Sequence, residues 1–347
     1  MLVLDRSADF ADIADGYIER QKMRDLTRQV NDIYRSESRS ELLRETIVEA
    51  ITNLPAIEVP VCTVPASGEK TLVVGIGDIH YGAKFKVEGL MGETINEYDS
   101  KIFEIRMWRL LDEIEAICEK ESINEIAVFL VGDLIDGMLR QSQLMRLQYG
   151  MVESTMRLSE FLATWLNALT KMALVTVCAV YGNHSEIRPL GSKKGQFEDE
   201  NLEKIVMWYL KERLRDNRCI LVQDECKKMM LANVRGYEFL LFHGEGEKRI
   251  DQVARDAVNL YQKKIDFFIC AHKHREQEFP SGITSDGNSV IIRVPSICGV
   301  NEFAQGKGYG GMPGATATVI ERGYGRRCIY PINLGEPYKL PEDDLPF

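Results

Sequence analysis

Residues 71–80 read TLVVGIGDIH, an apolar and largely β-branched run that ends in glycine and passes directly into an aspartate and a histidine. Short apolar runs bounded by glycine are typical of buried β-strands. The arrangement returns in EIAVFLVGD at residues 125–133 and in VTVCAVYGNH at residues 175–184. We therefore expect three buried strands, each ending at a polar group.

The segments between and after these strands carry apolar residues at helical spacing. Helices are expected at about 98–120, 144–172, 199–215 and 247–264. Strands that alternate with helices favour βαβ units around a mainly parallel, buried sheet. After residue 274 the chain changes to short β runs separated by glycine-rich turns, which predicts a second sheet packed on the first. The predicted fold class is α/β.

Four segments are expected along the chain. Residues 1–54 are predicted to form an N-terminal helical extension, because apolar side chains recur every three or four residues and Ser38 with Glu41 forms a capping box. Residues 55–70 hold three prolines and a Ser-Gly pair, which is typical of a linker. The main domain is predicted at residues 71–334, and residues 335–347 are predicted to be a C-terminal tail.

Composition limits the classes of function. The net charge of −10 argues against a broad basic surface that holds nucleic acid by charge alone. The eight cysteines are scattered without a CxxC pair, so buried, reduced thiols are expected. No basic N-terminal region precedes an apolar stretch, and no run approaches the roughly 20 apolar residues of a membrane span. We expect a cytoplasmic protein with no membrane partner.

All five histidines lie in short clusters that also contain glycine or acidic residues. They are His80 in GDIH, His184 in GNHSE, His243 in FHGE, and His272 and His274 in AHKH. Each cluster follows a predicted strand, and loops at the carboxyl ends of strands in an α/β sheet converge on one crevice. A single histidine could be an ordinary hydrogen-bonded residue, but five in this context predict a metal site.

Glycines at 77, 132 and 182 come just before the polar residues of three clusters, where we expect them to let the backbone turn sharply. Together with the histidines, Asp78, Asp133 and Asn183 make a mixed nitrogen and oxygen ligand set that suits manganese, iron or zinc.

This set has too many members for one tetrahedral zinc and suits two ions that share a carboxylate. A pair of ions activates water as hydroxide and stabilises the oxygens of an in-line displacement at phosphorus. The predicted reaction is hydrolysis of a phosphate ester. We expect Mn²⁺ first, with Fe²⁺, Zn²⁺ or Mg²⁺ as alternatives.

The blocks GDIH, GD, GNH, H and AHKH, in this order and at these separations, resemble those of the calcineurin-like metallophosphoesterase superfamily. The resemblance covers about residues 71–274 and implies a four-layer α/β/β/α sandwich of two packed mixed sheets. It implies that one ion is held by Asp78, His80, Asp133 and His274, and the other by Asp133, Asn183, His243 and His272. Asp133 would bridge the ions. His184 would be the catalytic residue near the leaving group, acting as general acid or stabilising charge in the transition state.

Two residues depart from the family pattern. Ala271 stands where the family usually has glycine, which affects only the local backbone angle. Ser185 stands where many members carry an acid directly after the histidine, and that acid is not a ligand. Because every ligand position is filled, a metal-free scaffolding relative is the weaker alternative.

The residues in and around these blocks indicate which substrate the protein cleaves. GDIHYGAKF, GDLIDG and AHKHREQE are most similar to SbcD-type repair exonucleases and to the exonuclease subunit of archaeal family D DNA polymerase. Met138 stands where protein phosphatases carry an arginine that grips phosphate. The resemblance therefore favours a DNA phosphodiesterase, an exonuclease or repair nuclease. The alternatives are a phosphatase or phosphodiesterase for small nucleotides or phosphoprotein, and a non-catalytic assembly module.

Contacts beyond the metal site are less determined. Candidate contacts to the phosphate backbone are Arg140, Arg188, Lys193 and Lys194, although each could equally be a solvated loop charge. The glycine-rich tract 301–315 is either a mobile flap with an aromatic for base stacking or an ordinary long β connection. The N-terminal helices could pack on the core, form a homodimer interface or bind a protein partner such as an ATPase.

Overall fold

The computed structural model describes residues 22–24, 26–27, 48–49, 51–55, 57, 59–60, 68–137, 147–187, 199–245, 250–284 and 287–335. The chain divides into two compact units, residues 1–56 and 57–347. In the first unit the described residues 22–24, 26–27, 48–49 and 51–52 are helical. Most of the predicted extension and linker, and nearly all of the tail, lie outside the described residues, so the segment boundaries and the role of the N-terminal helices stay predictions.

The second unit contains a six-stranded mixed sheet in the order β13-β12-β1-β4-β5-β6. The strands are β1 (Lys70–Ile76), β4 (Glu125–Val131), β5 (Leu174–Val180), β6 (Ile220–Lys227), β12 (Gly314–Glu321) and β13 (Gly325–Asn333). Strands β1, β4, β5 and β6 run parallel, whereas β12 is antiparallel to both of its neighbours. The predicted βαβ units therefore supply four of the six strands of this sheet.

A second mixed sheet has the order β10-β11-β9-β8-β7. Its strands are β7 (Met229–Val234), β8 (Tyr237–Phe242), β9 (Phe267–Cys270), β10 (Gln277–Thr284) and β11 (Gly287–Arg293). The central strands β8, β9 and β11 are parallel, and the two edge strands pair antiparallel with them. This sheet positions the later histidine clusters.

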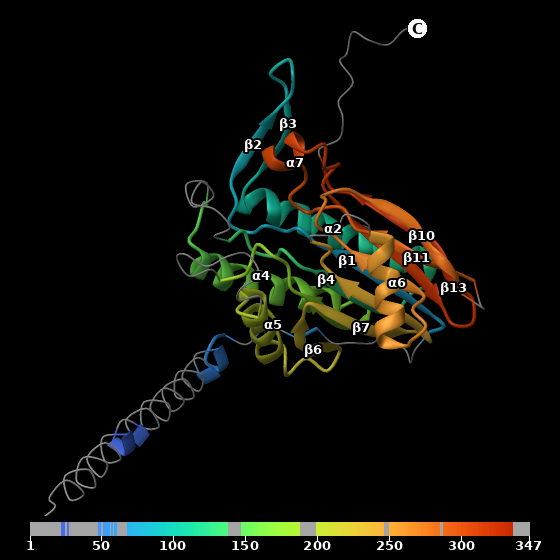
Figure 1. Cartoon of the computed structure of the whole chain (residues 1–347), viewed down its shortest axis with the longest axis horizontal. Helices are drawn as coiled ribbons and strands as arrows, with labels where there is room; N and C mark the ends of the chain where they lie inside the picture. The colour runs from blue at the N-terminus through green and yellow to red at the C-terminus, as the bar shows by residue number, and fades with distance from the viewer. Residues whose placement is uncertain are drawn as a thin grey trace, which may run out of the picture. The chain divides into compact units, whose positions relative to one another are not determined.

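The sheets and helices form four layers (Figure 1). Helices α2 (Ser100–Glu121), α4 (Met151–Leu169) and α5 (Leu202–Arg213) share one apolar core with the first sheet, and α6 (Ile250–Tyr261) shares another with the second. A third core, which includes Phe129 and Phe239, fills the space between the sheets. The predicted α/β/β/α sandwich of two mixed sheets is confirmed.

Two further expectations can be compared with the described residues. None of the seven cysteines there belongs to a disulfide, as expected for reduced thiols. Within the same part of the chain, no helix combines the length and the apolar character needed to span a membrane.

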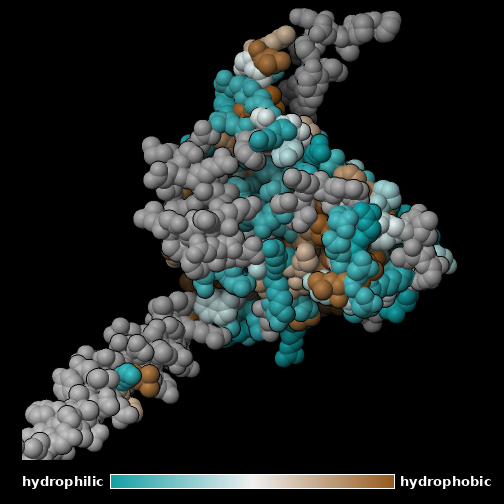
Figure 2. All heavy atoms as spheres, viewed as in Figure 1, coloured by the Kyte–Doolittle hydropathy of each residue, from teal (hydrophilic) through white to brown (hydrophobic). Residues whose placement is uncertain are grey.

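Several elements were not expected. Strands β2 (Phe85–Glu88) and β3 (Thr94–Tyr98) form a separate hairpin directly after the first cluster. Its tip exposes Leu90 and Met91 completely and is brown at the top of Figure 2. The glycine-rich tract 301–315 contains a short helix, α7 (Glu302–Gly306), and then enters β12. Its residue Gly310 donates a backbone hydrogen bond to the carbonyl of Lys273 (3.1 Å), so the tract lies against the last histidine cluster.

Candidate metal centre

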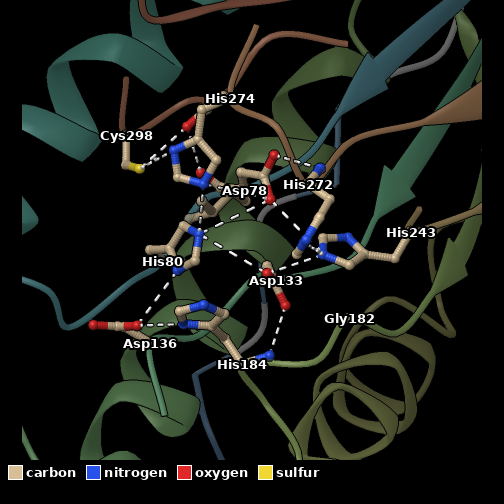
Figure 3. Close-up of polar contacts among 12 residues, drawn as sticks. Asp78, His80, Asp133, Asp136, Gly182, His184, His243, His272, His274 and Cys298 are labelled. Atoms are coloured by element: carbon tan, nitrogen blue, oxygen red, sulfur yellow. Dashed lines mark hydrogen bonds and ion pairs between the residues drawn. The ribbon is translucent and has the colours of Figure 1, made fainter. Parts of the chain in front are cut away.

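The predicted site residues follow five strand ends. Asp78 follows β1, Asp133 follows β4, Asn183 and His184 follow β5, His243 follows β8, and His272 and His274 follow β9. Since β1, β4 and β5 are parallel in one sheet, β8 and β9 are parallel in the other, and the sheets pack face to face, these loops meet at one end of the sandwich. Figure 3 shows the side chains from both sheets pointing toward one another.

One group of side chains gathers around Asp78. The Nε2 atoms of His80 and His274 lie 3.2 Å apart, and Oδ1 of Asp78 lies 3.9 Å from each of them. Oδ2 of Asp133 is 4.0 Å from Nε2 of His80. These atoms surround one position that a cation could take, with the ligand set that the resemblance implies for the first ion.

A second group lies beside the first. Nδ1 of His272 is 3.2 Å from Nε2 of His243, which is 2.9 Å from Oδ2 of Asp133. Because the same oxygen of Asp133 approaches both groups, its carboxylate is placed to bridge two ions. The assignment of each ligand to an ion stays a prediction.

The outward nitrogens of two histidines are fixed by backbone carbonyls. Nδ1 of His243 lies 2.8 Å from the carbonyl of Val131, and Nδ1 of His274 lies 3.0 Å from the carbonyl of Gly299. Donation of the Nδ1 proton to a carbonyl leaves the Nε2 lone pair directed into the centre, which is how metal-binding imidazoles are commonly oriented. The imidazoles are therefore preorganised as ligands.

Two buried oxygens support the fit to metal ions. Asp78 Oδ2 accepts a hydrogen bond from the backbone N–H of His272 (2.8 Å), whereas its Oδ1 has no hydrogen-bond partner among the described residues. The side-chain Oδ1 of Asn183 is likewise buried and, within that part of the chain, unpartnered. A buried oxygen without a partner carries a desolvation penalty of about 1–3 kcal/mol, which a cation would offset. Carboxylate, amide and imidazole donors together suit a divalent transition metal.

The electrostatics of the centre favour cations. Burial by itself would lower the pKa of His80, but the hydrogen bond to Asp136 and the neighbouring carboxylates raise it to about 9. Burial opposes protonation of His243 as well, and the charge of Asp133 nevertheless raises its pKa to about 10. Burial and the charge of His243 lower the pKa of His272 to about 3. The carboxylates thus favour protonation of His80 and His243, whereas His272 stays neutral.

The backbone at the centre is unusual. Five ligand residues adopt left-handed conformations with φ between 48° and 72°, namely Asp78, His80, Asp133, His272 and His274. For non-glycine residues this region costs on the order of 1–2 kcal/mol each, and such strain is common at functional sites. The loops are held in place by hydrogen bonds such as that from the N–H of His80 to the carbonyl of Asp133 (2.9 Å).

The expected role of the glycines needs correction. Of the three, only Gly132 has a positive φ, at 82°. Gly77 and Gly182 are required by close packing instead: a Cβ on Gly77 would lie 2.7 Å from that of Ala271, and a Cβ on Gly182 would collide with the Asp133 carboxylate. Ala271, with its side chain buried, has no positive φ, so alanine is compatible with this backbone.

His184 is placed differently from the ligands. Its backbone N–H donates to Oδ1 of Asp133 (2.7 Å), and its Nδ1 lies 2.8 Å from Oδ1 of Asp136. The side chain of His184 is 18% exposed, compared with 3% for His80 and His243 and 8% for His274. It is therefore more accessible to a substrate than these three ligands, and its imidazole is oriented by a carboxylate.

Two residues near the centre were missed from the sequence. Asp136 orients His184 and also lies 3.4 Å from Nδ1 of His80; the second aspartate of GDLIDG was a signal for it. Cys298 lies buried with its Sγ 3.8 Å from Nδ1 of His274, and nothing in its sequence context indicated this position. The four predicted substrate contacts, Arg140, Arg188, Lys193 and Lys194, lie outside the described residues, as does Met138.

Residues 71–276 match the model of the calcineurin-like phosphoesterase family. The chain belongs to this family. This calcineurin-like phosphoesterase is accordingly a metal-dependent hydrolase of phosphate esters, and its candidate centre contains clusters such as Asp133, His243 and His272 that could hold a metal ion. The identity of the metal stays a prediction.

Known proteins resemble the phosphoesterase to different extents. It is 28% identical over 316 residues to the SPbeta prophage-derived uncharacterized protein YonJ of Bacillus subtilis (strain 168), covering 90% of this chain and 76% of YonJ. A metallophosphoesterase from Sphaerobacter thermophilus overlaps with a TM-score of 0.35 at 12% identity, over 76% of this chain and 88% of that one. Vps29 from Entamoeba histolytica, complexed with Zn²⁺, overlaps with a TM-score of 0.34 at 11% identity, over 76% of this chain and 99% of that one. These structural overlaps are too low to bear on function.

Proposed function

We propose that this phosphoesterase hydrolyses phosphodiester bonds in DNA, as an exonuclease or repair nuclease, with two divalent ions held by the predicted ligands. The observation that carries the proposal is the convergence of two imidazole pairs on the carboxylates of Asp78 and Asp133, with unpartnered oxygens on Asp78 and Asn183. When bound, two such ions supply a nucleophile at neutral pH and neutralise charge on the phosphate. Mn²⁺ is the ion that we propose first.

His184 is proposed to act on the leaving group. Donation of its Nδ1 proton to Asp136 fixes the imidazole, and its ring lies nearly perpendicular to that of His80 (84°), with centroids 4.4 Å apart. Its Nε2 is then the nitrogen that can give a proton to the departing oxygen, or stabilise the charge that develops there. Its greater exposure than His80, His243 and His274 is what this role requires.

Local positive charge supports an extended anionic substrate despite the net charge of −10. Lys273 lies between two ligands and packs over the ring of Tyr309, with Nζ 5.6 Å from the centroid. Burial, and then the charges of the buried Arg293 and of Arg275, lower the pKa of Lys273. We propose that Lys273 and Arg275, which are both partly exposed, contact a phosphate group beyond the scissile one.

Two observations favour DNA over other phosphodiesters. The blocks GDIHYGAKF and AHKHREQE are similar to those of repair exonucleases, and the similar protein YonJ is prophage-derived. A small nucleotide or phosphoprotein is the second candidate, because the acidic net charge offers fewer phosphate contacts than nucleic acid usually requires.

The test is a panel of Mn²⁺-loaded wild type and variants on bis-p-nitrophenyl phosphate, single-stranded DNA, double-stranded DNA and RNA. We expect DNA degradation that His184→Ala reduces by about 10²-fold or more. Lys273→Ala should slow DNA hydrolysis more than hydrolysis of the small diester, whereas Lys171→Ala, at an exposed site after α4, should change neither. Turnover of the small diester without any DNA degradation would contradict the nuclease proposal. No turnover of any phosphodiester would favour the assembly module.

A further inference from the structure

Glu203 is a fully buried carboxylate in the first turn of α5. The N-terminus of this helix packs against the loop that carries His184: the side chain of Asn201 donates to the carbonyl of Gly182 (2.8 Å), and the N–H of Leu202 donates to the carbonyl of Ser185 (3.0 Å). Glu203 therefore projects from a helix that is already docked beside the metal centre.

One oxygen of Glu203 connects two loops of the centre. Its Oε1 accepts hydrogen bonds from the backbone N–H of Leu134 (3.0 Å) and from the hydroxyl of Ser185 (2.6 Å). Leu134 directly follows Asp133, and Ser185 directly follows His184. The Ser185 oxygen in turn lies 3.4 Å from the backbone nitrogen of Ile135. We call these three hydrogen bonds, around Glu203 and Ser185, the loop clamp.

The helix itself does not need this carboxylate. Asn201 caps α5 by accepting from the N–H of Glu203 (3.0 Å). The other oxygen of Glu203, Oε2, is buried and has no hydrogen-bond partner among the described residues. Burying a carboxyl group that is only partly hydrogen-bonded is unfavourable, and an apolar side chain would avoid that penalty. We therefore infer that the carboxyl group serves to connect the two loops that contain Leu134 and Ser185.

We propose that Glu203 is a positioning residue that holds His184 against Asp133 through the loop clamp. The contact that it maintains is the hydrogen bond from the backbone N–H of His184 to Oδ1 of Asp133 (2.7 Å). A displacement of about 1 Å between groups that act together can lower a rate by about 10²-fold. This inference rests on the phosphodiesterase activity proposed above, and it extends that activity to a residue outside the ligand set.

Four variants of the full-length, metal-loaded chain test the clamp. Glu203→Leu removes both acceptors, Glu203→Gln keeps an acceptor oxygen, and Ser185→Ala removes the hydroxyl alone. Glu200→Gln removes an exposed acid on the same segment and is the matched control. On bis-p-nitrophenyl phosphate, Glu203→Leu should lower kcat by about 10- to 100-fold with KM changed by less than about threefold. Glu203→Gln should regain most of the loss, and Glu200→Gln should match wild type.

Because the clamp acts through His184, the loss should depend on that residue. In a His184→Ala background, Glu203→Leu should reduce kcat by less than about threefold, since residues that act together are not additive. A full additional loss in this background, or a wild-type kcat in folded Glu203→Leu, would overturn the proposal. If Glu203→Leu does not fold, Ser185→Ala takes its place and should also lower kcat. A wild-type kcat in Ser185→Ala would then overturn the proposal.

A second readout does not depend on turnover. In zinc-loaded protein labelled at its five histidines, NMR should show the His184 imidazole signal, assigned with His184→Ala, shifted in Glu203→Leu and in Ser185→Ala but not in Glu200→Gln. An unshifted His184 signal in both clamp variants would contradict the inference. Absence of turnover in wild type would instead contradict the proposed activity, and the NMR comparison would still decide whether the clamp exists.

Discussion

The replacement Glu203→Gln should change how the stability of the metal-free chain depends on pH. Burial, and then the negative charge of Asp133, raise the pKa of Glu203 from 4.5 to about 7. Between these two values the folded protein retains a proton that the unfolded chain has lost, so the free energy of unfolding falls as pH rises through this window. At ~1.4 kcal/mol for each tenfold change in proton affinity, the wild type should lose about 2.5 kcal/mol between pH 5 and pH 8 through this group.

Glutamine cannot ionise and should not show this loss. We expect the difference in unfolding free energy, Glu203→Gln minus wild type, to grow by about 2.5 kcal/mol in favour of the variant from pH 5 to pH 8. Urea unfolding at four pH values in the presence of EDTA measures this difference in unfolding free energy. Glu200→Gln provides the control for loss of an exposed acid. A difference that stays constant across this range would refute the reasoning.

Three other perturbations act on the centre itself. Asp136→Asn should lower kcat by about 10²-fold at nearly constant KM, because His184 loses its orienting carboxylate; unchanged steady-state kinetics would argue against that role. Gly182→Ala should reduce bound Mn²⁺, measured by elemental analysis, because the added Cβ collides with Asp133; full metal content would count against the packing. Removal of metal with EDTA should lower the melting temperature by several degrees, as loss of a ligand of the native state does, and an unchanged transition would speak against a bound ion.

The strand ends were accessible to sequence reasoning because each combines two local signals. An apolar run such as residues 125–131 predicts a buried strand, and the polar residue after it predicts the site. The three glycines were identified correctly, but the expected sharp turn explains only Gly132 and is wrong for Gly77 and Gly182. Gly182 is constrained by the Asp133 carboxylate, a neighbour from another loop, and sequence alone gives no information about such a neighbour.

Other features were hidden for identifiable reasons. Strand β10 contains Pro280 and Gly282, which weaken a strand pattern, and it tolerates them because it is an edge strand with a register shift at that point. Glu203 reads in the sequence as an ordinary acid on a helix surface. Its function depends on Leu134, 69 residues earlier, so only the folded structure reveals the contact.

We propose that one chain holds two divalent ions bridged by Asp133. Elemental analysis after dialysis against Mn²⁺ counts these ions, with wild type compared to Asp133→Ala and to the exposed control Asp216→Ala. We predict two ions per chain in wild type and in the control, and at most one in Asp133→Ala. One ion or none in wild type, or two ions retained without Asp133, would contradict the two-metal centre.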